Sequence, residues 1–120
     1  MTIKPFRSGA EAVDALPAVM AIGAFSWKLE KWHPSEATAA SRYGECASYQ
    51  LIIRVRADMP EAQKAADTLL HEALHGIFFV YGVRDEDGEE RTVGMLARAL
   101  TALHRHNPWL GPWLARCLPG

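Results

Sequence analysis

The chain has 120 residues, of which 49% are hydrophobic, so its length and composition predict one domain over residues 1–120 with a modest apolar core. Thirteen Lys and Arg side chains oppose 14 Asp and Glu, which leaves a net charge of -1. A charge so close to zero excludes a strong electrostatic field, so we expect neither nucleic acid nor a membrane as a partner.

Two further features of the sequence bear on the compartment. Cys46 and Cys117 are too far apart for a CxxC pair, so we expect free thiols in a reducing compartment, with no disulfide framework and no cysteine zinc site. The N-terminal region has no basic start followed by an apolar run, and the longest apolar run, Ile77–Tyr81, is far shorter than the about 20 residues that span a bilayer. These features predict a cytoplasmic protein without a signal peptide or transmembrane segment.

The N-terminal third is predicted to contain a helix and a strand. Residues 8–24 are rich in alanine, and Ser8 followed by Glu11 fits a capping box, so we predict one helix that Pro17 interrupts. Residues 25–32 alternate with a period near two, which predicts a strand with one wet face.

The middle of the chain is predicted to hold a connector and a second strand. Residues 34–47 are small and polar, and we interpret them as a connector in which Gly44 marks a turn. Residues 49–55, YQLIIRV, are rich in β-branched and aromatic side chains and form the best strand candidate in the chain. The first half of the protein therefore predicts a small sheet.

The second half is predicted to be helical. From Glu61 to Tyr81 apolar residues recur at helical spacing, and Gly82 suits a left-handed C-cap. An acidic turn follows at residues 85–90, and a second amphipathic helix is expected before Asn107 and Pro108 close it. The apolar residues of that helix are Val93, Leu96, Ala97, Leu100 and Leu103. A short C-terminal helix is expected to cover the core with Trp109, Leu110, Trp113 and Leu114.

The motif with the clearest chemistry is LLHEALH at residues 69–75, which contains HExxH. Four residues of helix rotate His71 and His75 only about 40° apart, so both imidazoles can reach one ion. Glu72 lies about 100° round from His71, where a carboxylate can take a proton from the water of a bound zinc ion. We therefore predict His71 and His75 as Zn²⁺ ligands and Glu72 as the catalytic base.

A solvated polar stripe on the helix would produce the same letters without any metal. The motif, however, is flanked by apolar residues at helical spacing, which places its three ionisable groups beside a buried surface. Charged groups in that position are costly unless they are paired or bind a metal. This context favours the zinc site over the polar stripe.

Two histidines leave a catalytic zinc site incomplete, because such sites normally take three protein ligands and keep one position for water. The metzincin extension HExxHxxGxxH is absent, since Phe78 and Tyr81 stand where it needs Gly and His. The third ligand must therefore come from elsewhere in the chain.

A carboxylate of the following helix is the best source of that ligand. If the helix runs antiparallel from near Asp85, it brings Glu90 back almost level with His75, with Glu89 as the alternative. Glu90 also has a structural alternative, as the N3 partner of a capping box begun by Asp87. We predict Glu90 as the third ligand.

In the segments LLHEALHGIFFVYG and EERTVGMLARAL, the chain resembles minimal gluzincin-type zinc metallopeptidases, especially small phage-encoded ones, and more distantly ImmA/IrrE-like peptidases. These pair HExxH with a downstream Glu in an E-x-x-[AV] setting, which Glu90 and Val93 match. The ending HRHNPWL is also similar to the small phage proteins, and the resemblance covers roughly residues 48–110. Gly94 departs from the ImmA-like pattern, which has Asn or Asp there.

The resemblance implies a small α+β zincin-like domain, in which an antiparallel helix carries the third ligand and a strand such as residues 49–55 edges the cleft. The implied function is zinc-dependent hydrolysis of peptide bonds in a protein substrate, with a phage or host protein as a partner. The alternatives are a non-catalytic, zinc-stabilised interaction or virion-associated protein, and a regulator-cleaving module active only with its partner. Five side chains are available as oxyanion donors, and the sequence does not choose among them: His33, Tyr43, Tyr49, Tyr81 and His104.

Overall fold

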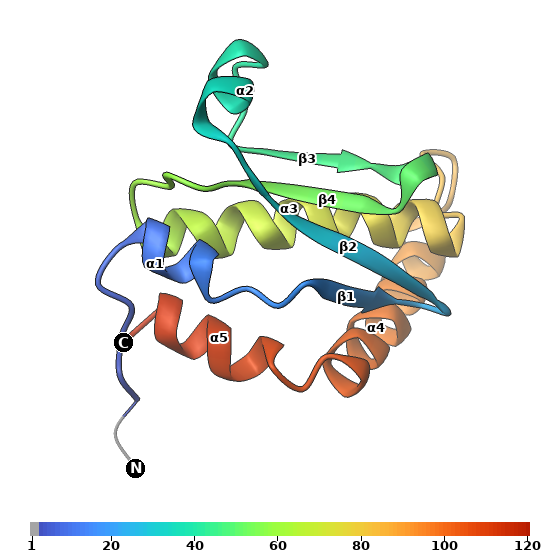
Figure 1. The fold of residues 1–120 in the computed structure, drawn as a ribbon. Coiled ribbons are helices and arrows are strands. Elements are labelled where there is room, and N and C mark those ends of the chain that lie inside the picture. Colours follow the sequence, from blue (N-terminus) through green and yellow to red (C-terminus); the bar gives the residue numbers. More distant parts are fainter. Residues whose placement is uncertain (1–2) are drawn as a thin grey trace.

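A computed structural model describes residues 3–120 (Figure 1). In this part of the chain, the N-terminal half holds four strands and two short helices, and three further helices form the C-terminal half. The elements in chain order are α1 (Gly9–Asp14), β1 (Val19–Ile22), β2 (Phe25–Trp32), α2 (Pro34–Ala39), β3 (Gly44–Ala47), the 3₁₀ turn η1 (Ser48–Gln50), β4 (Ile52–Arg56), α3 (Ala62–Tyr81), α4 (Glu89–His106) and α5 (Leu110–Cys117). The class is α+β, as predicted.

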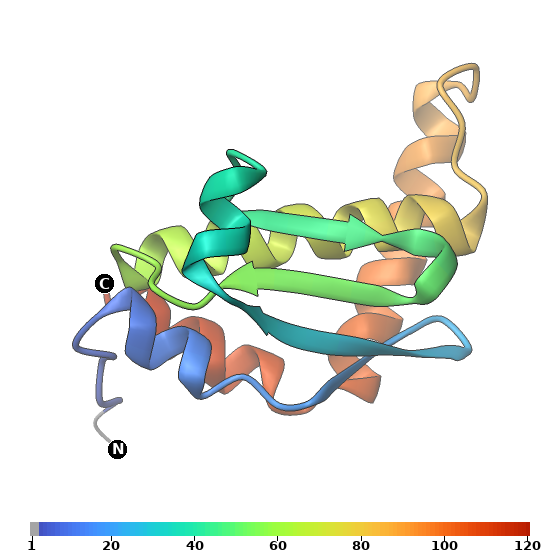
Figure 2. The same cartoon turned by 45° about the horizontal axis from the view of Figure 1, so that its top comes forward.

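The four strands form one mixed sheet in the order β1-β2-β4-β3. Strand β1 pairs antiparallel with β2, β2 pairs parallel with β4, and β3 pairs antiparallel with β4. Strands β1 and β3 are therefore the two edges, and β4 lies inside the sheet, as Figure 2 shows.

The core lies between the sheet and α3, which runs along one face of it (Figures 1 and 2). From the sheet come fully buried apolar side chains of β1, β2 and β4, namely Met20, Ile22, Trp27, Ile53 and Val55. From α3 come apolar residues at helical spacing, namely Ala65, Ala66, Leu69, Ala73 and Ile77. Burial of this apolar surface is the main force that holds α3 on the sheet.

The opposite face of the sheet carries a row of charges. Arg54 on β4 donates to Glu30 on β2 at 2.8 Å and to Glu45 on β3 at 2.7 Å, in register across three strands. Hydrogen bonds from Lys28 and Arg54 hold the pKa of Glu30 below its usual value, against the opposing effect of burial. A charged, solvated face is typical of a sheet that is covered on one side only.

The prediction of one broken helix over residues 8–24 is correct for its first half and wrong for its second. Ser8 caps α1 by accepting from the Glu11 N–H at 3.1 Å. After Pro17 the chain forms β1 instead, because a turn at Gly23, whose φ is +60°, returns it antiparallel along β2. The strand at residues 25–32 is confirmed as β2.

The connector predicted over residues 34–47 is also wrong. His33 caps α2 by accepting from the Ser35 N–H at 3.2 Å, and β3 follows as an edge strand. The strand predicted at 49–55 begins only at Ile52, because η1 and the left-handed Leu51, with φ of 55°, precede it. It is an interior strand, so β3 and not residues 49–55 forms the edge beside α3.

The two long predicted helices are confirmed as α3 and α4. Gly82 ends α3 in the left-handed conformation with φ of 68°, and Asn107 ends α4. The expected antiparallel arrangement is not found, because α4 crosses the end of α3 steeply in both views (Figures 1 and 2). Its two buried residues, Ala99 and Leu103, lie in its C-terminal half, which packs against β1 and thereby sets its direction.

The C-terminal helix α5 covers the core as predicted. Leu110 and Trp113 are buried, and the Trp113 indole N–H donates to the Ala12 carbonyl at 2.9 Å. Among residues 3–120, no helix combines the length and the apolar character needed to cross a membrane.

Candidate metal centre

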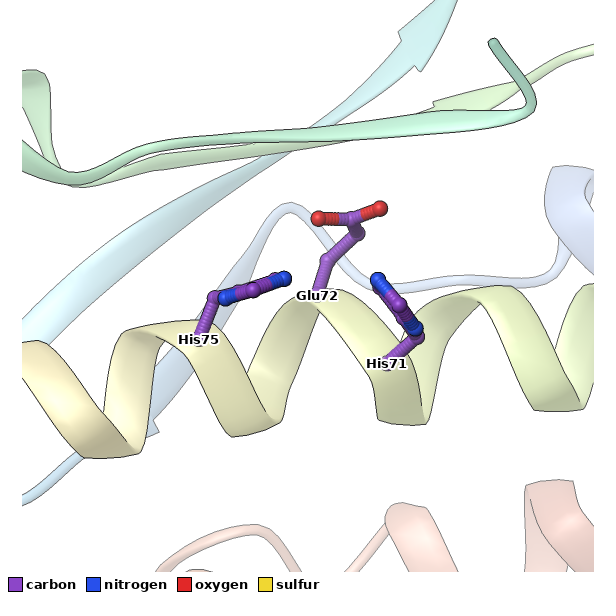
Figure 3. A group of neighbouring side chains, drawn as sticks. All are labelled: His71, Glu72 and His75. Carbon is purple, nitrogen blue, oxygen red and sulfur yellow. The ribbon is translucent and has the colours of Figure 1, made fainter. Parts of the chain in front are cut away.

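Helix α3 brings three side chains of the HEALH motif together. One ligand atom from each of His71, Glu72 and His75 lies within 4.8 Å of the other two, and the imidazole centroids are 4.9 Å apart. In Figure 3 both rings lean toward the carboxylate of Glu72, which points toward the sheet. The i, i+4 spacing therefore has the effect predicted from the sequence.

The packing of α3 explains why these three side chains differ in exposure. Thr68, Leu69, Glu72 and Ala73 lie on the face that meets the sheet, and Glu72 is only 8% exposed. The two histidines flank that face and remain exposed. The Glu72 carboxylate is therefore buried at the cavity wall, and the two imidazoles lie on the solvent-exposed side of it.

Burial gives Glu72 the character of a base. Desolvation raises its pKa above the usual value for a carboxyl group, against the lowering effect of His71, His75 and Arg42 nearby. Its side chain has no hydrogen bond or ion pair with any other residue of 3–120. A buried carboxylate with a raised pKa and free oxygen atoms is suited to accept a proton at neutral pH.

The wall opposite the histidines is the edge strand β3, and Gly44 allows its close approach. A Cβ atom at Gly44 would lie 2.6 Å from Cγ2 of Thr68 and 3.1 Å from Cγ of Glu72. Only glycine permits this contact between strand and helix. The prediction that Gly44 marks a turn missed this role, because the contact of Gly44 with α3 depends on how β3 and α3 pack together.

A cavity of about 610 Å³ lies between β3 and α3. Its wall includes all three residues of the motif, together with Arg42, Tyr43, Gly44, Glu45, Cys46, Lys64, Asp67 and Thr68 and the neighbouring Ser41 and Ser48. Apart from Tyr43, one of the five candidate oxyanion donors, the residues of segment 41–48 could not be identified from local spacing, because they meet α3 only through the fold.

Cys46 is the least expected member of that wall. It follows Gly44 by two residues, so its side chain faces α3, and it is a free, half-buried thiol. Burial raises its pKa, opposed by the Ser48 hydroxyl at 3.5 Å and reinforced by Glu72 and Glu45. The free state of both cysteines agrees with the sequence prediction.

The structure does not bring Glu90 to the histidines. Glu89 and Glu90 lie exposed in the first turn of α4, outside the metal-binding group and outside the cavity wall. The capping box considered for Glu90 is not formed either, because Gly88 is the N-cap. Asp87 instead accepts from the Arg84 N–H at 2.9 Å.

Of the five side chains considered as oxyanion donors, Tyr43 lines the cavity. The Tyr43 ring lies 5.1 Å from the Lys64 ammonium group and 5.9 Å from the Arg56 guanidinium. The other four are not part of the cavity wall: His33 caps α2, Tyr49 is in η1, Tyr81 ends α3, and His104 contacts its own helix.

Comparisons with protein-family models, with curated proteins and with solved structures each found no match to this chain. The chemistry of the donor set is therefore the basis for interpreting the site. Two imidazoles and a carboxylate are ligands that zinc takes in proteins, and their convergence within 4.8 Å fits one ion.

Proposed function

We propose that this protein is a zinc-dependent peptidase, with His71 and His75 as metal ligands and Glu72 as the general base. The observation that supports this most strongly is the convergence of these three side chains at the wall of a cavity of about 610 Å³. Their resemblance in sequence to small phage-encoded metallopeptidases supports the same reaction and a protein substrate.

The residues divide the reaction between them. His71 and His75 would hold a zinc ion, which when bound would supply Lewis acidity toward a peptide carbonyl and a water. Glu72 takes the proton of the attacking water, because its carboxylate is adjacent to both imidazoles and its pKa is raised by burial. The same group then returns the proton to the leaving amine.

The edge strand β3 provides a means of holding a peptide. The Arg56 N–H donates to the Tyr43 carbonyl at 2.8 Å, so in this register the backbone groups of Tyr43 and Glu45 point to β4. The backbone N–H and C=O groups of Gly44 and Cys46 then point to the free edge of β3. An extended peptide can hydrogen-bond to these groups and so add a further strand to the sheet.

We retain Glu90 as the proposed third ligand, which requires the N-terminal half of α4 to approach the histidines. That half contributes no fully buried residue, although Leu96 near its end packs partly buried against the core. The first turns of α4, which carry Glu90, therefore have little packing that opposes such a movement.

The position of Glu72 also favours a second candidate. Its carboxylate lies within the group of atoms that could bind one ion, so it could itself be the third ligand. A site of His71, Glu72 and His75 would then lack a free base. This would make the protein a non-catalytic, zinc-stabilised interaction protein.

Glu72→Gln separates the two candidates. If Glu72 is the base, the variant keeps stoichiometric zinc and loses peptide cleavage by about a hundredfold or more, because amide and carboxylate have similar size but only the carboxylate accepts the proton. If Glu72 is a ligand, zinc is lost as well. Zinc content by elemental analysis and cleavage of a denatured protein substrate measure the two effects.

His71→Ala is the matched control, because it should lower zinc content under both candidates. Stoichiometric zinc in His71→Ala would contradict the metal site itself. Zinc lost in both variants, with no cleavage by the wild type, would favour the interaction protein over the peptidase.

A further inference from the structure

We infer that the cavity between β3 and α3 binds an extended peptide in one direction, with aromatic or apolar residues on the N-terminal side of the scissile bond and a carboxylate on its C-terminal side. This inference rests on the proposed peptidase function. It assigns Arg42 as the residue that recognises the carboxylate.

The two walls of the cavity run in the same direction, so its ends can be assigned. Gly44, at the start of β3, meets Thr68 of α3. The wall of the cavity ends at Ser48 on the other side, and the histidines of α3 lie between these two ends. Just beyond Ser48, the ring of Tyr49 in η1 meets the ring of Phe79 near the end of α3 at 5.5 Å in an edge-to-face contact.

The end before Gly44 carries an unpaired positive charge. The two cationic side chains of the cavity wall, Arg42 and Lys64, lie at this end. Lys64 is paired with Asp67, with 3.8 Å between the charged atoms. Glu45 is paired with Arg54 at 2.7 Å. The side chain of Arg42 has no hydrogen bond or ion pair with any residue of 3–120. An exposed guanidinium without a partner favours a carboxylate of the ligand, which it can bind with two hydrogen bonds.

The surface just beyond the Ser48 end of the cavity is aromatic. Tyr49 is 95% exposed and Phe79 45%, and Phe78, three residues beyond His75, is 39% exposed. Grouped exposed aromatic side chains are typical of interaction surfaces. They favour aromatic or apolar side chains in the ligand.

The free edge of β3 sets the direction of the peptide. An added strand pairs more stably when it is antiparallel. A peptide antiparallel to β3 enters beside Tyr49 and leaves beside Arg42. Its apolar residues therefore precede the histidines and Glu72, and its carboxylate follows them.

Peptide binding to the full, metal-free chain tests this assignment without requiring zinc or turnover. Fluorescence anisotropy would compare a labelled, amidated peptide whose aromatic half precedes a glutamate half with the same sequence reversed. We expect the forward peptide to bind about tenfold more tightly or better. A third peptide, with alanines in place of glutamates and a free C-terminus, distinguishes a terminal carboxylate from an acidic side chain.

Arg42→Glu should reduce affinity for the forward peptide by about tenfold or more, since it replaces attraction with repulsion. Arg98→Glu is the matched control, because Arg98 is an exposed arginine on α4 without an ion pair among residues 3–120. It should leave binding unchanged.

Equal binding of forward and reversed peptides, tighter binding of the reversed one, or equal effects of the two Arg variants would overturn the inference. Cleavage by the zinc-loaded wild type is judged separately. Directional binding without cleavage would contradict the peptidase proposal alone, whereas cleavage without directional binding would contradict only this inference.

Discussion

Gly44 determines how closely the edge strand β3 approaches the helix that carries the candidate metal site. We predict that Gly44→Ala lowers stability by about 1–3 kcal/mol, because the added Cβ atom would lie 2.6 Å from Cγ2 of Thr68. It should also weaken zinc binding, since the same atom would lie 3.1 Å from Cγ of Glu72. Urea unfolding and a zinc titration measure these effects.

Gly94→Ala is the control for that prediction. Gly94 lies inside α4, and a Cβ atom added there would lie 4.0 Å from its nearest neighbour, Nη1 of Arg98. The same substitution at this position should therefore stabilise the protein by about 0.5–1 kcal/mol. Thr68→Ser, which removes the clashing methyl group, should restore part of the stability of Gly44→Ala. Unchanged stability in Gly44→Ala would show that β3 does not pack against α3 as described.

Helix α4 is the element whose position matters most for the third ligand. We predict that Glu90→Gln weakens zinc binding by about tenfold or more, because a carboxylate ligand would be replaced by a neutral amide. Competition with a zinc chelator measures the affinity. Glu89→Gln is the matched control, since its carboxylate is also exposed in the first turn of α4.

A movement of α4 has its own signature. If Glu90 binds zinc, backbone amides in the N-terminal half of α4 should become more protected from hydrogen exchange when zinc is added. Equal zinc affinities for wild type, Glu90→Gln and Glu89→Gln, with no change in exchange, would exclude Glu90 as a ligand.

Asn107 joins the sheet to the C-terminal helices and so contributes to the stability of the whole molecule. It is 3% exposed, donates to the Ala21 carbonyl at 2.7 Å and the Leu103 carbonyl at 2.8 Å, and accepts from the Ala21 N–H at 2.8 Å. The two bonds with Ala21 satisfy backbone groups at the outer edge of β1, which would otherwise be open to pairing with another chain.

We predict that Asn107→Ala destabilises the protein by about 2–4 kcal/mol, because it removes three hydrogen bonds, one of them buried and two partly buried. Asn107→Asp keeps the acceptor and loses both donors, so it should also destabilise. Chemical unfolding followed by circular dichroism measures both, and a loss under about 0.5 kcal/mol in Asn107→Ala would contradict this role.

The sequence by itself determined the features that depend on neighbours along the chain. Helical spacing of apolar residues predicts α3 and α4, and the i, i+4 spacing of His71 and His75 places both imidazoles on one side of α3. The alternation at residues 25–32 likewise predicts β2. In each case the hydrogen bonds or the side-chain period lie within one element, so local pattern is enough.

Only the tertiary structure decided the features that depend on distant partners. Strands β1 and β3 are short, and they form because β2 and β4 supply hydrogen bonds that local propensity does not show. The packing of α4 on β1 sets its direction and leaves Glu90 away from the histidines. The cavity wall at residues 41–48 exists because Gly44 lets a strand approach α3, a contact between segments far apart in the sequence.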